Sequence, residues 1–152
     1  MARFILAYHS TTGNTKAMAD AISEGARSLE LEPELVDAFD VRIEDLEEAD
    51  AIGFGVPTFM YGPAKPVLSL VNQLRSRADG RKIAVVFGSY GWSGQGPIVI
   101  ARLLRERGFH VLDPVIRVRY GPTENELFGC SLLGKEVARQ LKGHRPTLSL
   151  EA

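Results

Sequence analysis

The sequence contains very few of the residues that form disulfides or metal sites, and no membrane-length apolar run. Cys130 is the one cysteine in 152 residues, which excludes an internal disulfide and a cysteine-rich metal centre. The three histidines, His9, His110 and His144, are dispersed and form no metal-binding pattern. No apolar stretch approaches the length of a membrane-spanning helix, and the N-terminus lacks a signal-peptide layout. We therefore expect a cytoplasmic protein with neither a membrane partner nor a bound metal.

Excess charge of either sign is also missing. The chain has 18 Lys and Arg against 19 Asp and Glu, a formal net charge of −1. This argues against nucleic acid as the main partner. Hydrophobic residues make up 45% of the chain, which suits one globular domain with a real core. We expect that domain to span residues 1–143 and to be followed by a C-terminal tail over residues 144–152.

One stretch near the N-terminus has the character of an anion-binding loop. The apolar run of residues 4–7 stops abruptly, small polar residues follow, and a helical pattern begins at once. A helix N-terminus offers unpaired N–H groups and a positive dipole end, both of which suit a phosphate. The alternative is that these residues only cap the helix. The predicted phosphate-binding residues are Ser10, Thr11, Thr12, Gly13, Asn14 and Thr15.

The motif Ser10-x-Thr12-Gly13-x-Thr15 after a first strand resembles the phosphate loop of flavodoxins, which bind flavin mononucleotide (FMN). This resemblance implies that FMN is the cofactor. The rest of the chain agrees in pattern, because apolar runs alternate with helical stretches. Strands are predicted at residues 3–8, 34–37, 51–56, 82–87 and 110–119, and helices at residues 14–29, after Pro66, after Pro97 and after Thr123, with a short helix or solvated connection at 44–50.

That alternation predicts a three-layer α/β fold. Five parallel strands with right-handed crossovers suit the flavodoxin-like order 2-1-3-4-5, with helices on both faces of the sheet. In open α/β sheets, ligands bind beyond the carboxyl ends of the strands, where the strand order reverses. Flavodoxin is itself a standard example of that rule. We therefore expect the ligand crevice beyond the first and third strands.

Two further loops should open onto the same crevice. A flavin ring needs flat apolar faces and backbone polar groups along its edge; aromatic rings supply the first and glycines allow close backbone approach. We expect Trp92 or Tyr61 to stack on a face of the ring. The alternative is that these aromatics cap the core and the glycines only make turns. The predicted ring-binding residues are Pro57, Thr58, Phe59, Met60, Tyr61 and Gly62 in one loop, and Ser89, Tyr90, Gly91, Trp92, Gly94, Gln95 and Gly96 in the other.

The two ring-binding loops resemble one group of flavoproteins more specifically than flavodoxins in general. Gly55-x-Pro57-Thr58 and residues 87–94 are similar to the flavin domain at the carboxyl end of flavodiiron proteins, as is the run ending in Tyr120-x-Pro122. The similarity covers roughly residues 3–142. It includes no diiron domain, so oxygen or nitric oxide reduction at a metal is not implied. The resemblance does imply that a backbone carbonyl in the third-strand loop, with Gly62 as the candidate, accepts a hydrogen bond from N5 of the reduced flavin.

The sequence therefore predicts an FMN-binding electron-transfer protein that shuttles one or two electrons between redox proteins and has no catalytic residues of its own. The expected partners are a flavodoxin reductase and ferredoxin-, rubredoxin- or flavodiiron-type proteins, and a homodimer stays open. An FMN-dependent NAD(P)H or quinone oxidoreductase is the second interpretation. A non-redox module that binds a phosphorylated ligand is the third.

One motif is a decoy. Gly129-x-x-x-x-Gly134-Lys135 resembles a nucleotide-binding P-loop, but Glu136 stands where Ser or Thr should coordinate magnesium. The motif also lies within a predicted helix and does not follow a strand. We therefore reject it as a nucleotide site. Cys130, in the same helix, is expected to be a buried packing residue.

Overall fold

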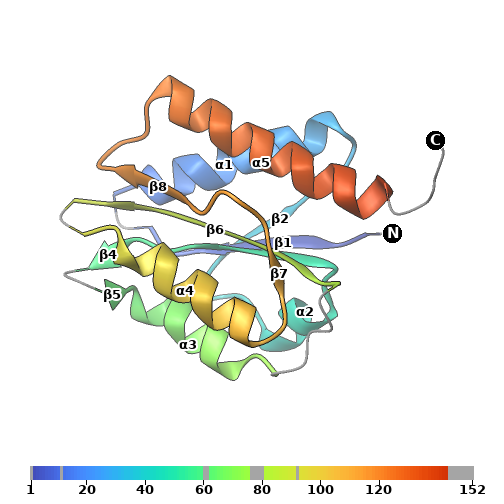
Figure 1. Cartoon of the computed structure of the whole chain (residues 1–152), viewed down its shortest axis with the longest axis horizontal. Helices are drawn as coiled ribbons and strands as arrows, with labels where there is room; N and C mark the ends of the chain where they lie inside the picture. The colour runs from blue at the N-terminus through green and yellow to red at the C-terminus, as the bar shows by residue number, and fades with distance from the viewer. Residues whose placement is uncertain (1, 11, 60–61, 76–80, 92, 144–152) are drawn as a thin grey trace.

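A computed structural model describes residues 2–10, 12–59, 62–75, 81–91 and 93–143. Its central sheet is parallel, with β2, β1, β3 and β6 in that order and with β7 and β8 both pairing with β6 (Figure 1). This confirms the predicted three-layer fold and its 2-1-3-4-5 order, with β6 as the fourth strand and β7 and β8 together as the fifth. The elements are β1 Phe4–Tyr8, α1 Asn14–Ser28, β2 Glu34–Asp37, α2 Ile43–Glu48, β3 Ala51–Gly55, β4 Thr58–Phe59, β5 Gly62–Pro63, α3 Lys65–Gln73, β6 Ile83–Tyr90, α4 Gln95–Glu106, β7 His110–Val111, β8 Ile116–Arg119 and α5 Glu124–Gly143.

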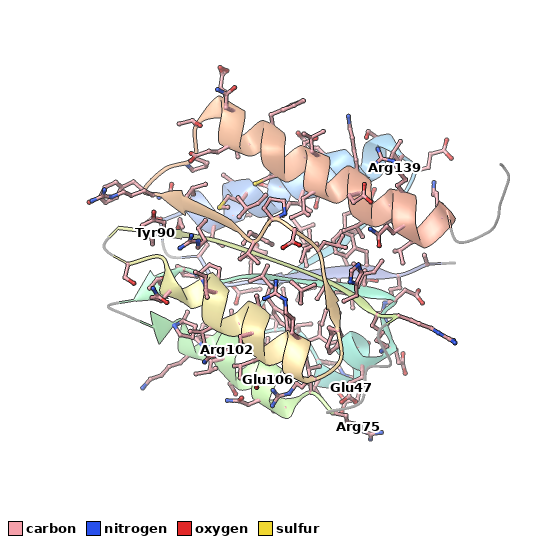
Figure 2. All side chains as sticks on the ribbon, in the orientation of Figure 1. Glu47, Arg75, Tyr90, Arg102, Glu106 and Arg139 are labelled. Atoms are coloured by element: carbon pink, nitrogen blue, oxygen red, sulfur yellow. The ribbon has the colours of Figure 1, made fainter. Side chains whose placement is uncertain are left out.

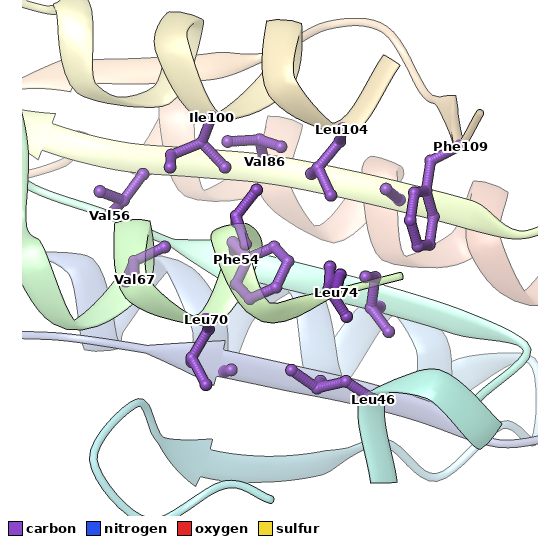
Figure 3. Close-up of a cluster of buried hydrophobic side chains, with 14 of the residues drawn as sticks. Leu46, Phe54, Val56, Val67, Leu70, Leu74, Val86, Ile100, Leu104 and Phe109 are labelled. Carbon is purple, nitrogen blue, oxygen red and sulfur yellow. The ribbon is translucent and has the colours of Figure 1, made fainter. Parts of the chain in front are cut away.

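Helices bury both faces of the sheet. Helices α1 and α5 cover one face, and α2, α3 and α4 cover the other (Figure 1). The central strand β3 is buried along its whole length, which explains why its sequence is apolar without alternation. Figure 3 shows side chains of α2, β3, α3 and α4 meeting on the second face, among them Leu46, Phe54, Leu70 and Leu104. Each such fully buried side chain contributes roughly 1.5–3 kcal/mol.

Glycines set the closeness of α1 and α5. A Cβ atom on Gly25 would lie 1.9 Å from the carbonyl oxygen of Ser131, and one on Gly134 would lie 1.9 Å from that of Ile22. The two helix backbones therefore touch at these points. The P-loop lookalike is thus a helix whose second glycine serves packing. Cys130 is fully buried beside it, and burial raises the pKa of its thiol to about 12, which keeps it protonated.

Local sequence signals located most elements but missed three boundaries. The single strand predicted over 110–119 is wrong, because β7 and β8 are separate and Pro114 between them has no N–H to give to a ladder. The strand predicted to end at residue 87 runs to Tyr90, since Gly88 pairs within the sheet. Helix α4 begins at Gln95 and not at Pro97.

The loop predicted over residues 57–63 also contains structure that the sequence did not signal. Strands β4 and β5 pair as a small antiparallel hairpin, with Thr58 opposite Pro63 and Phe59 opposite Gly62. Two residues in each strand are too few to leave a periodic pattern. The capping box at the start of α5 is confirmed, since the side chains and backbone N–H groups of Thr123 and Glu126 bond reciprocally at 3.1 and 2.9 Å. Within the described ranges, no helix combines the length and apolarity needed to cross a membrane.

Candidate functional site

The predicted loops converge at one rim of the sheet, beyond the carboxyl ends of β1, β3 and β6. Figure 1 shows this rim at the left, where α1 begins, the β4–β5 hairpin projects and β6 and β8 end. Because all these strands are parallel, their carboxyl ends share one edge, and segments far apart in the chain become neighbours there. The rim lies at the point where the connections diverge from β1 to either side of the sheet.

The first loop presents donors at the start of α1. The hydroxyl oxygen of Ser10 accepts hydrogen bonds from the backbone N–H groups of Gly13, at 3.1 Å, and of Lys16, at 3.3 Å. Gly13 has φ +90°, a left-handed conformation that lets the chain turn sharply into the helix. Thr12 and Asn14 complete the turn, with a 3.5 Å contact between the Thr12 hydroxyl and the Asn14 N–H. Thr11 lies outside the described residues.

The electrostatics of this turn suit a phosphate. The first turn of α1, all of which the structure describes, contains no acidic residue, so its positive dipole end is not neutralised from within. Lys16 lies exposed and pairs with Asp20 at 3.1 Å. Neutral hydroxyl and backbone donors around a helix N-terminus are thus the groups on offer, and they fit the phosphate end of FMN.

Two buried hydroxyl bonds join the three loops to one another. The hydroxyl oxygens of Thr15 and Ser89 lie 3.1 Å apart, which links the start of α1 to the end of β6. The Thr58 hydroxyl accepts the N–H of Gly96 at 2.8 Å, which links the β4–β5 hairpin to the first turn of α4. All three of these hydroxyl residues are nearly or fully buried. Their side chains therefore hold the loops in register with one another.

The ring-side loops place the other predicted residues as follows. Pro57 is buried, Gly62 lies in β5, and Gln95 is exposed at the start of α4. Gly94 lies between the Tyr90 ring and the Arg117 guanidinium, because a Cβ there would be 3.1 and 3.0 Å from them. Met60, Tyr61 and Trp92 lie outside the described residues, as does the side chain of Phe59. The predicted stacking on Trp92 or Tyr61 therefore stays a prediction.

A fourth segment reaches this rim, and the sequence interpretation did not assign it to the site. The backbone N–H of Tyr120 donates to the carbonyl of Tyr90 at 2.6 Å, and the Tyr120 ring lies against Gly91. The next residue, Gly121, approaches the side chain of Asn14 in the first loop. Tyr120 has φ +61°, which is uncommon for a residue with a side chain. The motif Tyr120-x-Pro122 was visible in the sequence, but only tertiary contact places it here.

Thr58 offers a direct test of the link between the hairpin and α4. Replacing Thr58 with valine keeps the shape but removes the acceptor, and leaves the buried N–H of Gly96 without it. We expect a loss of about 1–3 kcal/mol in the free energy of unfolding, measured by urea denaturation. Thr58→Ser keeps the acceptor and should recover most of that loss. Equal losses in the two variants would contradict this role for the hydroxyl.

The fold and the rim together define a doubly wound α/β protein with an anion-type site at its switch point. The family model described as Flavodoxin matches residues 6–134, so the chain belongs to the flavodoxin family. As a member of that family it is a flavodoxin-like, FMN-binding domain.

This chain matches relatives of two kinds: flavodoxins of about the same length, and longer proteins of which it matches one part. A solved flavodoxin from the domain Archaea is 40% identical with a TM-score of 0.85, covering 92% of this chain and 99% of that chain. The Flv1 flavodiiron core from Synechocystis sp. PCC6803 is 28% identical with a TM-score of 0.85, covering 95% of this chain and 37% of that one. The coenzyme F420H(2) oxidase of Methanocaldococcus jannaschii is 32% identical over 146 residues, which cover 91% of this chain and 35% of the oxidase. The chain thus spans about a quarter to a third of the curated relatives it matches.

Proposed function

We propose that this chain is an electron carrier that passes one or two electrons between redox proteins. The observation that carries the proposal is the convergence of the FMN-type loops at one open rim, where a flavin edge can meet a partner. The flavin supplies the redox chemistry, and the protein supplies binding, orientation and electrostatics. The likeness to a solved flavodoxin over nearly its full length supports the same role.

We assign the phosphate of FMN to the first loop. Ser10, Thr12 and Asn14 offer side chains there, and the backbone N–H groups of Gly13 and Lys16, which donate to the Ser10 hydroxyl, point into the same turn. Thr11, with its hydroxyl, is part of the same proposal. Thr15 supports this loop from the interior of the protein, because its hydroxyl is buried against Ser89. The flavin ring would lie between the β4–β5 hairpin and the loop after β6, with Trp92, Tyr61, Met60 and Phe59 as proposed contacts.

The proposal is tested by loading the protein with FMN. We expect a yellow complex with a flavin absorption band and tight FMN binding, and weaker binding of riboflavin, which lacks the phosphate. The loaded protein should be reduced by a flavodoxin reductase and reoxidised by a rubredoxin or ferredoxin. A preparation that stays colourless after incubation with FMN would contradict the proposal.

A second candidate function is an oxidoreductase that takes electrons directly from a small reduced coenzyme. The coenzyme F420H(2) oxidases among the relatives favour it, although they are about two and a half times as long as this chain. It predicts multiple turnover with NADH, NADPH or reduced F420 and no reductase protein. A carrier is instead reduced slowly by these donors and quickly by a reductase.

Gly62 provides a redox test of the resemblance to flavodiiron proteins. A Cβ at Gly62 would meet no atom within 4 Å among the described residues, and the position lies in β5, where β-branched residues are favoured. Gly62→Val should therefore fold normally while stiffening the peptide that is proposed to turn toward N5. We expect the gap between the two one-electron potentials to narrow by about 1 kcal/mol in a redox titration. An unchanged gap would refute this role for Gly62.

A further inference from the structure

The near-zero net charge conceals a strong separation of charge along the chain. Residues 1–50 contain 12 Asp and Glu but 4 Lys and Arg, whereas residues 51–152 contain 7 Asp and Glu but 14 Lys and Arg. The first segment forms β1, α1, β2 and α2, and β2 is one edge of the sheet. Strands β7 and β8 lie beyond β6 at the other edge. The acidic residues of the first segment lie mostly at the amino ends of the strands, away from the rim, where Arg3 pairs with Glu34, Asp45 and Glu48. Arg117 and Arg119 of β8 instead lie at the rim, beside the end of β6.

Two arginines at this edge of the sheet, Arg117 and Arg119, have no carboxylate near them, which among the described arginines is also true of Arg102 on α4 and Arg107 just after it. Arg117 and Arg119 are exposed on β8, on either side of the buried Val118. Within the described part of the chain, neither guanidinium has a carboxylate oxygen within 4.0 Å. Most other arginines do: Arg3, Arg27, Arg42, Arg75, Arg105 and Arg139 all form ion pairs.

These arginines adjoin the ring-side loop. Arg117 donates a 3.4 Å hydrogen bond to the carbonyl of Gly94. The guanidinium of Arg119 lies 5.7 Å from the centre of the Tyr120 ring, which is 63% exposed and rests on Gly91. We call Arg117, Arg119 and Tyr120 the arginine edge. Exposed Arg and Tyr side chains are the types that dominate binding energy at protein interfaces.

The acidic residues that next follow the arginine edge in the chain form no ion pair with it in the described structure. Glu124 and Glu126 lie on the first turn of α5, and Glu126 is held by its capping bond to Thr123. The ring-side segments themselves, residues 55–64 and 88–101, contain no Asp or Glu. The guanidinium groups of Arg117 and Arg119 are therefore the charged groups that contact the ring-side loop, through Gly94 and Tyr120.

We propose that the arginine edge is the docking site of an acidic redox protein, which exchanges electrons with the flavin past Gly91 and Gly94. The inference rests on the proposed carrier function. An acidic partner is selected by charge: it is attracted to the two guanidinium groups, and the ring-side segments contain no Asp or Glu that would offset them. That charge steers the partner and fixes its orientation.

The test compares two one-electron acceptors of opposite charge, an acidic rubredoxin and the basic cytochrome c. Electron transfer from the reduced FMN-loaded protein is followed by stopped flow between about 0.01 M and about 1 M ionic strength, where the Debye length falls from about 30 Å to about 3 Å. We expect the second-order rate constant with rubredoxin to fall at least about tenfold over this range. The rate constant with cytochrome c should not fall in this way.

Charge-reversal variants test whether the arginine edge causes this dependence of the rate constants on ionic strength. Arg119→Glu should lower the rubredoxin rate constant about tenfold at low ionic strength, raise that of cytochrome c, and have little effect near 1 M. Arg139→Glu is the matched control, with the same charge change on an exposed arginine. Figure 2 shows Arg139 near the far end of α5, at the opposite end of the molecule from Tyr90. This control should change neither rate constant by more than about twofold.

The outcomes separate this inference from the carrier function. If FMN binds and electrons flow but Arg119→Glu and Arg139→Glu behave alike, the docking site is overturned and the carrier function stands. If NADPH at constant ionic strength competes with rubredoxin in the parent but not in Arg119→Glu, the edge binds a phosphorylated nucleotide, and the acidic-protein proposal is overturned. An absorption spectrum of each variant shows that FMN is still bound in the same environment.

Discussion

Replacing Ser10 with aspartate should lower the affinity for FMN about 100-fold while leaving the protein at least as stable. The Ser10 hydroxyl now accepts the N–H groups of Gly13 and Lys16, and an aspartate carboxylate can take over these bonds. A carboxylate at a helix N-terminus is favourable by about 0.3–1 kcal/mol. The same carboxylate would occupy the phosphate donors and repel the phosphate, which costs on the order of 3 kcal/mol.

This prediction is specific because the aspartate should lower FMN affinity without lowering the free energy of unfolding. FMN affinity is measured by fluorescence quenching, and stability by urea denaturation of the FMN-free protein. Ser10→Asn is the control, because it retains a capping oxygen without the charge and should bind FMN more tightly than Ser10→Asp. Riboflavin affinity should be nearly equal in the parent and the aspartate variant. A parallel loss of riboflavin and FMN binding would show that Ser10 does not act on the phosphate.

Gly134→Ala should destabilise the fold by more than about 3 kcal/mol. Its added Cβ would lie 1.9 Å from the carbonyl oxygen of Ile22, and the backbone of α1 cannot yield as a flexible side chain could. The two helices would have to separate, which opens the contact around the buried Met18 and Cys130. Overpacking of a tight core usually costs about 1–3 kcal/mol, and more when backbone must move.

Gly129 in the same helix supplies the matched control. A Cβ there would meet no atom within 4 Å among the described residues. Gly129→Ala should therefore gain about 0.5–1 kcal/mol from helix propensity alone. Urea denaturation of both variants measures the difference. Two similar stabilities would mean that α1 and α5 do not touch at Gly134.

The contrast between these glycines explains why one sequence motif could mislead. Gly129 and Gly134 have the spacing of a P-loop, yet they lie within a single helix, one facing solvent space and the other facing α1. Helical pattern around the motif was enough to reject a nucleotide site. It was not enough to tell which glycine is indispensable, because that depends on the neighbouring helix.

In the candidate site, too, the sequence indicates some features and tertiary contacts decide others. The sequence was enough to predict an anion-binding character for the first loop. The signals were a buried strand, a run of small polar residues with Gly13, and a helix start. Thr15, Thr58 and Ser89 were expected to contact the cofactor, but their residue types alone did not indicate that their hydroxyls bond across loops. The positions of Met60, Tyr61 and Trp92 relative to the ring stay predictions.

The sequence by itself therefore determined the class of fold and the strand order, because hydrophobic periodicity and helix-start chemistry are properties of neighbouring residues. Together with the resemblance to flavodoxins, it also indicated three loops, which stay predicted as the phosphate- and ring-binding segments. The tertiary structure decided which hydroxyls tie the loops together, that β7 and β8 are separate strands, and that Tyr120 joins the site. It also brought Arg117 and Arg119 to the same rim, beside the end of β6. Those facts depend on residues far apart in sequence meeting at one edge of a parallel sheet, and no local signal encodes such a meeting.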